Sequence, residues 1–153
     1  TPDQSSAASD VYKRQVDYYT LPIGKASILK EGEAVTIIAY GAAVHWALET
    51  LSNNPSINAD LIDLRSLQPL DYDCILKSLK KTNRVIILQE DSLFGGIASD
   101  ISAYIMENAF EFLDAPVQRV GSLDTPIPFA SSLEHQYLAK RNFETALKAL
   151  LNY

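Results

Sequence analysis

The sequence is poor in cysteine and in basic residues. Its one cysteine, Cys74, excludes a disulfide within the chain. The 13 Lys and Arg residues are outnumbered by 19 Asp and Glu, which gives a formal net charge of -6 and an isoelectric point near 4.8. Nucleic-acid binding needs clustered Lys and Arg that displace counterions, so this composition opposes a nucleic-acid partner and favours a basic protein partner.

Long hydrophobic runs are also missing. No apolar stretch approaches the roughly 20 residues that cross a bilayer, and no charged start followed by an apolar core marks a signal peptide. With only one cysteine, these features fit a reducing compartment. We therefore expect a cytoplasmic protein that makes no contact with a membrane.

Composition divides the chain of 153 residues into two unequal parts. Residues 1–15, TPDQSSAASDVYKRQ, are mostly small, polar or charged, and we predict a tail, a linker or an expression remnant there. Residues 16–153 are enough for one domain with a single core and too few for two. We expect one folded domain over that range.

Apolar runs alternate with helical patterns along this domain. Continuous apolar stretches at 34–40, 59–64 and 84–89, and a weaker one at 115–120, predict strands. Apolar residues at i, i+3, i+4 and i+7 or similar spacing predict four amphipathic helices. Their apolar positions are Val44, Ala47, Leu48 and Leu51; Tyr72, Ile75, Leu76 and Leu79; Ile97, Ile101, Tyr104 and Ile105; and Phe143, Ala146, Leu147 and Leu150.

The helix ends carry further signals. Asp71 and Asn142 are predicted to cap the second and the last helix, and Lys77, Lys80 and Lys81 suit the negative end of the second helix dipole. Continuous apolar strands separated by amphipathic helices are typical of parallel sheets that are covered on both faces. The sequence therefore predicts an α/β fold of three layers, α/β/α, around a mostly parallel sheet of about five strands.

The stretch LIDLRSLQPLD places two charged residues, Asp63 and Arg65, where a predicted strand ends. Ligands and partners gather at the carboxyl ends of strands in open α/β sheets, so both residues are candidates for an interface. Two interpretations stay open from sequence alone. The residues pair with each other or with the loop backbone, which is the favoured interpretation, or they take a direct chemical role.

No local pattern predicts an active site. The glycine pair of LQEDSLFGGIASD has the strand–loop–helix setting of a phosphate-binding loop, but Glu90 and Asp91 would repel a phosphate, and a tight turn is the better interpretation. Cys74 lies in a predicted helix as a packing residue. His45 and His135 have no companion at the spacing of metal ligands. We expect no catalytic, cofactor-binding or metal-ligating residue in this chain.

Four segments, taken in order, resemble a known family. They are LPIGKASILKEGEAVTIIAYGAAVHWALE, DLIDLRSLQPLD, LKKTNRVIILQEDSLFGGIASDI and FEFLDAPVQRVGSLDTPIPFA. Together they resemble the C-terminal domain of the β subunit of thiamine-diphosphate-dependent 2-oxoacid dehydrogenases, the E1 component. This is the transketolase C-terminal domain family, and the resemblance extends from about residue 16 to residue 153.

The resemblance implies an enzyme whose active site lies outside these residues. In the family, the pyrophosphate of thiamine diphosphate and its Mg²⁺ are held by the α subunit or a fused α region, and the activating glutamate belongs to the preceding domain of the β subunit. The complete enzyme decarboxylates a 2-oxo acid and passes the acyl group to lipoamide on the E2 core. We therefore expect this chain to bind no cofactor and to be inactive alone.

The resemblance also implies partners: the E1 α subunit or fused α region, a second β subunit, and the subunit-binding domain of E2. Asp114 of FLDAPV and the terminal carboxylate of Tyr153 match acidic groups that receive arginines of E2. A turn residue before Ala115 and Pro116 is an equal alternative for Asp114. Asp63 and Arg65 are predicted to hold the following loop against the rest of the E1 subunit.

The segments VHWALE, LDTPIPFA and ALLNY most resemble branched-chain, 2-oxoisovalerate, dehydrogenases, with pyruvate dehydrogenase as the near alternative. The chain departs from the family at Gln89, where relatives often have histidine, and at Ala139, where proline is frequent. Two other classes stay open. One is a flavodoxin-like binding module, and the other is a purely structural domain that forms dimers.

Overall fold

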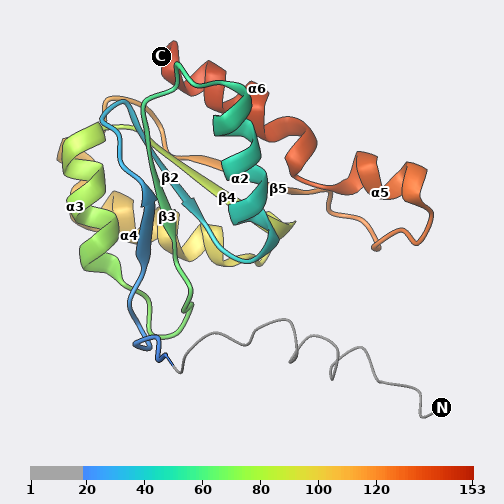
Figure 1. The fold of residues 1–153 in the computed structure, drawn as a ribbon, viewed down its shortest axis with the longest axis horizontal. Coiled ribbons are helices and arrows are strands. Elements are labelled where there is room, and N and C mark those ends of the chain that lie inside the picture. Colours follow the sequence, from blue (N-terminus) through green and yellow to red (C-terminus); the bar gives the residue numbers. More distant parts are fainter. Residues whose placement is uncertain (1–18) are drawn as a thin grey trace.

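The fold is built on a five-stranded sheet in a computed structural model that describes residues 19–153 (Figure 1). The strand order is β1-β3-β2-β4-β5, and β1 alone runs antiparallel to its neighbour. The strands are β1 (Ser27–Lys30), β2 (Val35–Ala39), β3 (Ala59–Asp63), β4 (Val85–Ser92) and β5 (Gln118–Ser122). The predicted mostly parallel sheet is confirmed, whereas the predicted tail at 1–15 lies outside the described residues.

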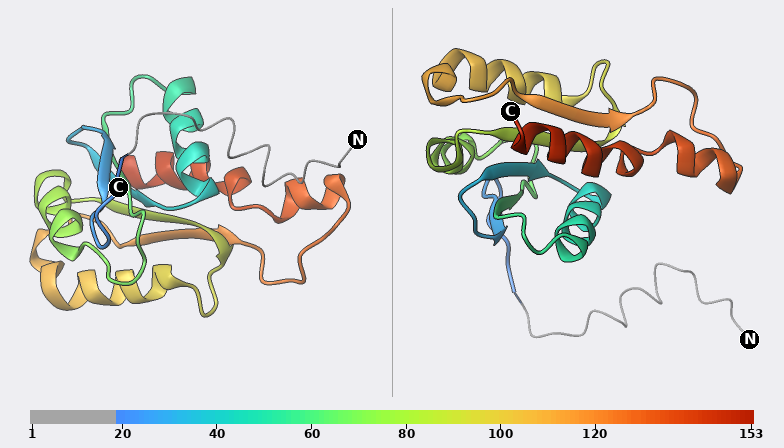
Figure 2. Two further views of the ribbon diagram at one scale, coloured as in Figure 1. Left: turned by 60° about the horizontal axis from the view of Figure 1, so that its bottom comes forward. Right: turned by 90° about the horizontal axis from the view of Figure 1, so that it is seen from above.

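Helices cover both faces of the sheet and complete the three predicted layers (Figure 2). They are α2 (Ala42–Asn53), α3 (Tyr72–Thr82), α4 (Ile97–Ala109), α5 (Ser131–Tyr137) and α6 (Lys140–Leu151), with a 3₁₀ turn, η1 (Phe110–Phe112), after α4. Helices α2 and α6 pack on one face, and α3 and α4 pack on the other. No helix in residues 19–153 is long and apolar enough to span a bilayer.

Alternation along the strands supplies two cores from one set of apolar runs. Ile37 of β2 faces α2 and α6, whereas its neighbour Ile38 faces α3 and α4, and both side chains are fully buried. Successive side chains of a strand point to opposite faces, so a strand covered on both sides is apolar at most positions. Each fully buried Ile contributes roughly 1.5–3 kcal/mol of burial free energy.

The predicted cap of α3 is confirmed, whereas the predicted cap of α6 and the expected place of Leu48 on the apolar face of α2 are wrong. The carboxylate of Asp71 accepts the amide proton of Cys74 at 3.3 Å. Asn142 does not cap α6, which begins two residues earlier at Lys140, where the amide of Ala139 is bound by Ser122 Oγ at 3.1 Å. Leu48 is exposed, so the face of α2 that is buried is narrower than the spacing of its apolar residues predicts.

The last strand begins later than predicted, at Gln118 instead of residue 115. Pro116 has no amide proton for a ladder, and the preceding Asp114 donates its amide to the carbonyl of Asn83 at 2.8 Å. The segment from 113 to 117 is thereby held as an irregular connection between η1 and β5. This connection forms part of the site described below.

A buried polar network, which the sequence did not indicate, crosses the start of β3. Asp60 is fully buried, and its carboxylate accepts hydrogen bonds from the Gly32 amide at 2.7 Å, Ser78 Oγ at 2.6 Å and Lys81 Nζ at 2.7 Å. Thr36 Oγ1 is 2.6 Å from Ser78 Oγ and extends the network to β2. The network ties the β1–β2 connection, β3 and α3 together.

Candidate functional site

The predicted site residues lie at opposite edges of the sheet. Asp63 ends β3, so it lies at the carboxyl edge. Asp114 bonds to Asn83, which lies two residues before the start of β4, and Tyr153 follows the end of α6 and lines the same pocket as Asp114. The structure therefore brings Asp114 and Tyr153 together and keeps them apart from Asp63 and Arg65.

At the carboxyl edge, Asp63 and Arg65 hold one another. The amide of Arg65 donates to Asp63 Oδ1 at 3.1 Å, and Arg65 Nε lies 3.7 Å from Asp63 Oδ2. Arg65 has a φ of 55°, a left-handed conformation that the contact with Asp63 helps to fix. The local pairing favoured from sequence is thus observed, while the predicted contact of this pair with the rest of an E1 subunit stays a prediction.

The loop after Arg65 contacts the segment that leads into β1. Pro69, whose bond to Gln68 is cis, packs against Gly24 so closely that a Cβ on Gly24 would lie 2.8 Å from Pro69 Cγ. Asp71 accepts the amide of Ala26 at 3.1 Å and lies 3.6 Å from the ammonium of Lys25. The loop is therefore fixed at the edge where the preceding part of the chain arrives.

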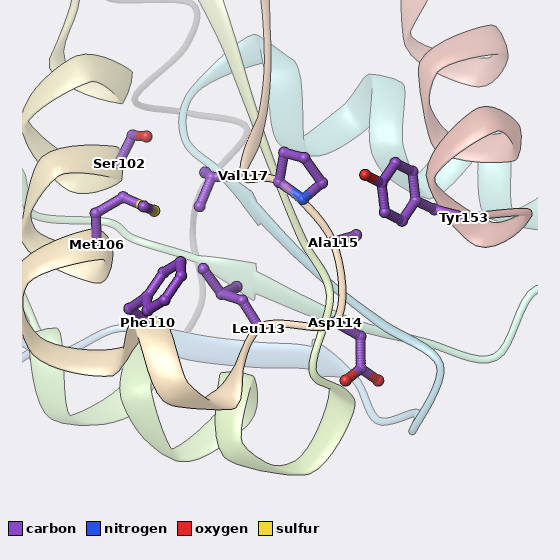
Figure 3. A pocket seen from close by; sticks show the side chains of 9 residues that line it. Ser102, Met106, Phe110, Leu113, Asp114, Ala115, Val117 and Tyr153 are labelled. Atoms are coloured by element: carbon purple, nitrogen blue, oxygen red, sulfur yellow. The ribbon is translucent and has the colours of Figure 1, made fainter.

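At the opposite edge, a pocket of about 460 Å³ lies between α4, η1, the connection to β5 and the end of α6 (Figure 3). Its lining consists mainly of apolar side chains. The lining residues are Ser102, Met106, Phe110, Leu113, Asp114, Ala115, Pro116, Val117 and Tyr153. We call this cavity the Asp114 pocket.

The Asp114 pocket has the chemistry of a protein-binding surface. Phe110 is 64% exposed, Met106 44% and Tyr153 73%, so large apolar groups that usually lie in cores face solvent here. Within residues 19–153, the carboxylate of Asp114 has no hydrogen-bond or ion-pair partner, and it lies at the rim in Figure 3. Exposed aromatic and Met side chains around a free charge are typical of sites that anchor a partner protein.

Sequence reasoning found two residues of this pocket and missed its apolar wall. Asp114 and Tyr153 came from the resemblance, and the pairing of both with a partner stays a prediction. Ser102, Met106 and Phe110 follow one another at intervals of four residues, which places them on one helical side. That spacing indicates the wall, although the stripe at Ile101 and Ile105 that faces the core is the stronger apolar pattern of the same helix.

The glycine pair after β4 is a packing feature, as the sequence indicated. Gln89 is fully buried, accepts the amide of Ala98 at 2.9 Å, and donates to the carbonyl of Ser92 at 2.5 Å. A Cβ on Gly96 would lie 2.1 Å from Gln89 Nε2. Gln89, which the sequence singled out only for the absence of a histidine, is the residue that holds this loop.

Replacing Gln89 by Leu is expected to lower the free energy of unfolding by about 2 kcal/mol, because the buried amide of Ala98 loses its acceptor. Urea unfolding followed by circular dichroism measures the loss. Gln136→Leu is the matched control, since Gln136 is exposed and bonds only to its own helix. Equal losses for the two variants would contradict the assigned role.

The carboxyl edge has the wrong charge for a diphosphate. Burial raises the pKa of Tyr40, and the charges of Asp91 and then Glu90 raise it further, so a negative potential surrounds the end of β4. In the part of the chain that the structure describes, no group of His, Cys, Asp or Glu residues is arranged to hold a metal ion. These residues do not fit thiamine diphosphate with its Mg²⁺.

Comparison with known proteins identifies relatives of this fold. The model of the family described as "Transketolase, C-terminal domain" matches residues 24–142. A solved structure described as a split-gene transketolase, an inactive β4 tetramer, superposes with a TM-score of 0.72 at 30% identity, covering 88% of this chain and 43% of that one.

Three curated relatives are β subunits. The acetoin:2,6-dichlorophenolindophenol oxidoreductase subunit of Bacillus subtilis is 48% identical over 124 residues, which are 80% of this chain and 36% of that protein. The pyruvate dehydrogenase E1 subunit of Rickettsia bellii is 44% identical, covering 74% and 36%. The 2-oxoisovalerate dehydrogenase subunit of Bacillus subtilis is 36% identical, covering 90% and 43%. The chain thus spans well under half the length of these relatives.

Proposed function

Because the chain belongs to the transketolase C-terminal domain family, we propose that it is the C-terminal domain of the β subunit of a 2-oxoacid dehydrogenase E1 component. Its proposed role is subunit assembly and the docking of E2. The observation that carries the docking role is the union of Asp114 and Tyr153 in one exposed, largely apolar pocket. Identities of 36–48% to curated β subunits support the assignment to this kind of subunit.

The proposal leaves the chemistry to other parts of the enzyme. Thiamine diphosphate with Mg²⁺, held outside this domain, supplies the decarboxylation of the 2-oxo acid when it is bound. The acidic end of β4 supports this division, because Glu90 and Asp91 oppose a diphosphate. The domain's own contribution is to pair with the α subunit and a second β subunit and to offer the Asp114 pocket to E2.

Charge and shape both favour E2 docking at the Asp114 pocket. An unpaired carboxylate at the rim attracts an arginine of the subunit-binding domain, and a charge-assisted hydrogen bond then fixes the orientation. Met106 and Phe110 provide apolar area beside it. Salt screens the charged part of such a contact and weakens it, whereas the apolar part of the contact is not weakened by salt.

The Asp114→Asn substitution is expected to weaken binding of the E2 subunit-binding domain about tenfold, which corresponds to roughly 1.4 kcal/mol for loss of one charged pair. Calorimetry at low and at moderate salt measures the dissociation constant. The loss should be larger at low salt. Glu33→Gln, which removes one negative charge from the exposed connection between β1 and β2, serves as the matched control. Equal binding by both variants, or no binding by the folded wild-type chain, would contradict docking at this pocket.

A second test concerns the carboxyl edge. Arg65→Ala should weaken assembly of the complete β subunit with its α subunit by roughly tenfold. It should destabilise this domain by only about 1 kcal/mol, since the ion pair with Asp63 is long, at 3.7 Å, and remains in contact with solvent. Co-purification titrations measure assembly, and urea unfolding measures stability. A large loss of stability with unchanged assembly would leave Arg65 as a local turn residue.

The identity of the substrate is the most specific part of the proposal. The sequence segments favour a branched-chain 2-oxo acid, but this preference is not confirmed, because acetoin and pyruvate subunits show identities of 48% and 44% against 36% for the 2-oxoisovalerate subunit. The kcat/KM values of the complete enzyme for acetoin, pyruvate and 2-oxoisovalerate decide among them.

A further inference from the structure

A second cavity, of about 480 Å³, opens at the carboxyl edge beside a projecting segment. We call residues 123–139 the arm. The arm contains α5 and extends away from the sheet in Figure 1. The cavity lies between the ends of β2 and β4 and the arm, and its walls include Tyr40, Glu90, Asp91, Ile127, Glu134 and Tyr137. It is at the opposite edge from the Asp114 pocket.

The arm exposes large apolar side chains. Ile127 is 69% exposed, Leu133 is 54% exposed, and Phe129 is fully exposed. These three residues fall within seven positions of the chain, so the arm concentrates exposed apolar surface, and Ile127 among them lines the cavity. Concentrated exposed apolar surface of this kind marks a place where another molecule binds.

The cavity itself is negative. Glu90, Asp91 and Glu134 contribute three carboxylates, and across residues 19–153 none of them forms a salt bridge with a Lys or Arg. The pKa of Tyr40 is raised by burial and then by the charges of Asp91 and Glu90, which is consistent with this potential. A cationic group would therefore be stabilised between these carboxylates and the two tyrosine rings.

Hydrogen bonds hold the cavity walls in place without any ligand. The amide of Leu123 donates to the carbonyl of Tyr137 at 3.0 Å and closes the two ends of the arm. Ser122 Oγ donates to the carbonyl of Glu90 at 2.5 Å and accepts the amide of Ala139 at 3.1 Å. The arm and the acidic end of β4 are thereby joined through one hydroxyl, so a partner meets a preformed surface.

We propose that this cavity docks a polypeptide segment of a partner protein in which an arginine is flanked by apolar side chains. The guanidinium group lies among Glu90, Asp91 and Glu134 and stacks on a tyrosine ring, while the apolar neighbours cover Phe129 and Ile127. Arginine suits the cavity better than lysine, because its planar group both pairs with carboxylates and stacks on aromatic faces. The inference goes beyond the proposed function and does not depend on it.

A random dodecapeptide library displayed on phage and selected against the intact 153-residue chain provides the test. Enriched peptides are expected to carry an arginine beside an aliphatic or aromatic residue. Fluorescence polarisation then gives the dissociation constant of a synthetic peptide and of its arginine→citrulline form, which should bind at least tenfold more weakly.

Three variants separate this cavity from other binding. Glu90→Gln combined with Glu134→Gln should weaken the peptide at least tenfold, as should Phe129→Ala, which removes a fully exposed ring and leaves the fold intact. Glu31→Gln combined with Glu33→Gln removes the same charge elsewhere and should leave binding unchanged. Enrichment of peptides without arginine would overturn the inference. So would peptides whose binding is lost with Asp114→Asn but is unchanged with the cavity variants.

Discussion

Replacing Asp60 by Asn is expected to lower the free energy of unfolding by about 3–5 kcal/mol, which is the usual cost of breaking a buried charged pair. The asparagine side chain has one acceptor oxygen for the three donors that the carboxylate now serves, from Gly32, Ser78 and Lys81. Its amide group would also point a donor at donors. Urea unfolding at pH 7 measures the loss.

Glu49→Gln is the matched control for this substitution. Glu49 also pairs with a lysine, Lys140, at 2.6 Å, but its side chain is 55% exposed. An exposed pair contributes only about 0–1 kcal/mol, so the control should change stability little. Losses of the same size in both variants would contradict the importance given to burial.

The same carboxylate predicts a dependence on pH. Burial alone raises the pKa of Asp60, but hydrogen bonds from Lys81, Ser78 and the Gly32 amide, with the charge of Lys81, lower it below its ordinary value of 3.8. A lowered pKa means that the folded state favours the ionised form, so the contribution is complete above pH 3.8 and is lost as pH falls toward the folded-state pKa. The difference in stability between wild type and Asp60→Asn should therefore shrink below about pH 4.

Replacing Gly32 by Ala should destabilise the fold by about 3 kcal/mol or more, because the new methyl group meets backbone. Its Cβ would lie 2.4 Å from the Ala59 nitrogen and 2.5 Å from the Asn58 carbonyl carbon. The backbone of Asn58 and Ala59 cannot rotate aside as a flexible side chain can. The start of β3 must move, and the hydrogen bond from Gly32 to Asp60 moves with it.

Gly41→Ala is the informative comparison for Gly32→Ala. Gly41 has a φ of 58°, and a Cβ there meets nothing within 4 Å. The cost is then that of the backbone conformation alone, φ 58° and ψ -134°, which residues other than glycine rarely adopt, about 1–3 kcal/mol. The Tm of Gly32→Ala should lie below the Tm of Gly41→Ala in thermal unfolding. The reverse order would show that the backbone around Gly32 accommodates a methyl group with little loss of stability.

The layered fold could be predicted because the central strands are mostly apolar runs, as at VTIIA in β2. The network at Asp60 could not. Asp60 stands inside an apolar run, and its partner Lys81 reads from sequence as a helix-dipole residue, although the fold pairs them at 2.7 Å. The arm was also missed, because α5 has seven residues and no apolar repeat.

The candidate site was predictable in part for a different reason. Asp114 and Tyr153 carry no local pattern, and only the resemblance to a family linked them, whereas the apolar wall at Met106 and Phe110 had a readable spacing of four. The cavity beside the arm needed the strand order. Tyr40 and Glu90 are far apart in sequence and meet because β2 and β4 are neighbours in the sheet.

A domain exchange tests the central claim most directly. Residues 16–153 would replace the matching C-terminal region of the β subunit of the Bacillus subtilis acetoin:2,6-dichlorophenolindophenol oxidoreductase, which is 48% identical over 124 residues. The chimera would be expressed with the other subunit of that enzyme, and acetoin-dependent dye reduction would be measured on the purified complex. The account predicts an assembled and active complex. A chimeric β subunit that folds but neither assembles nor supports dye reduction would contradict the assignment of this chain as an E1 β-subunit domain.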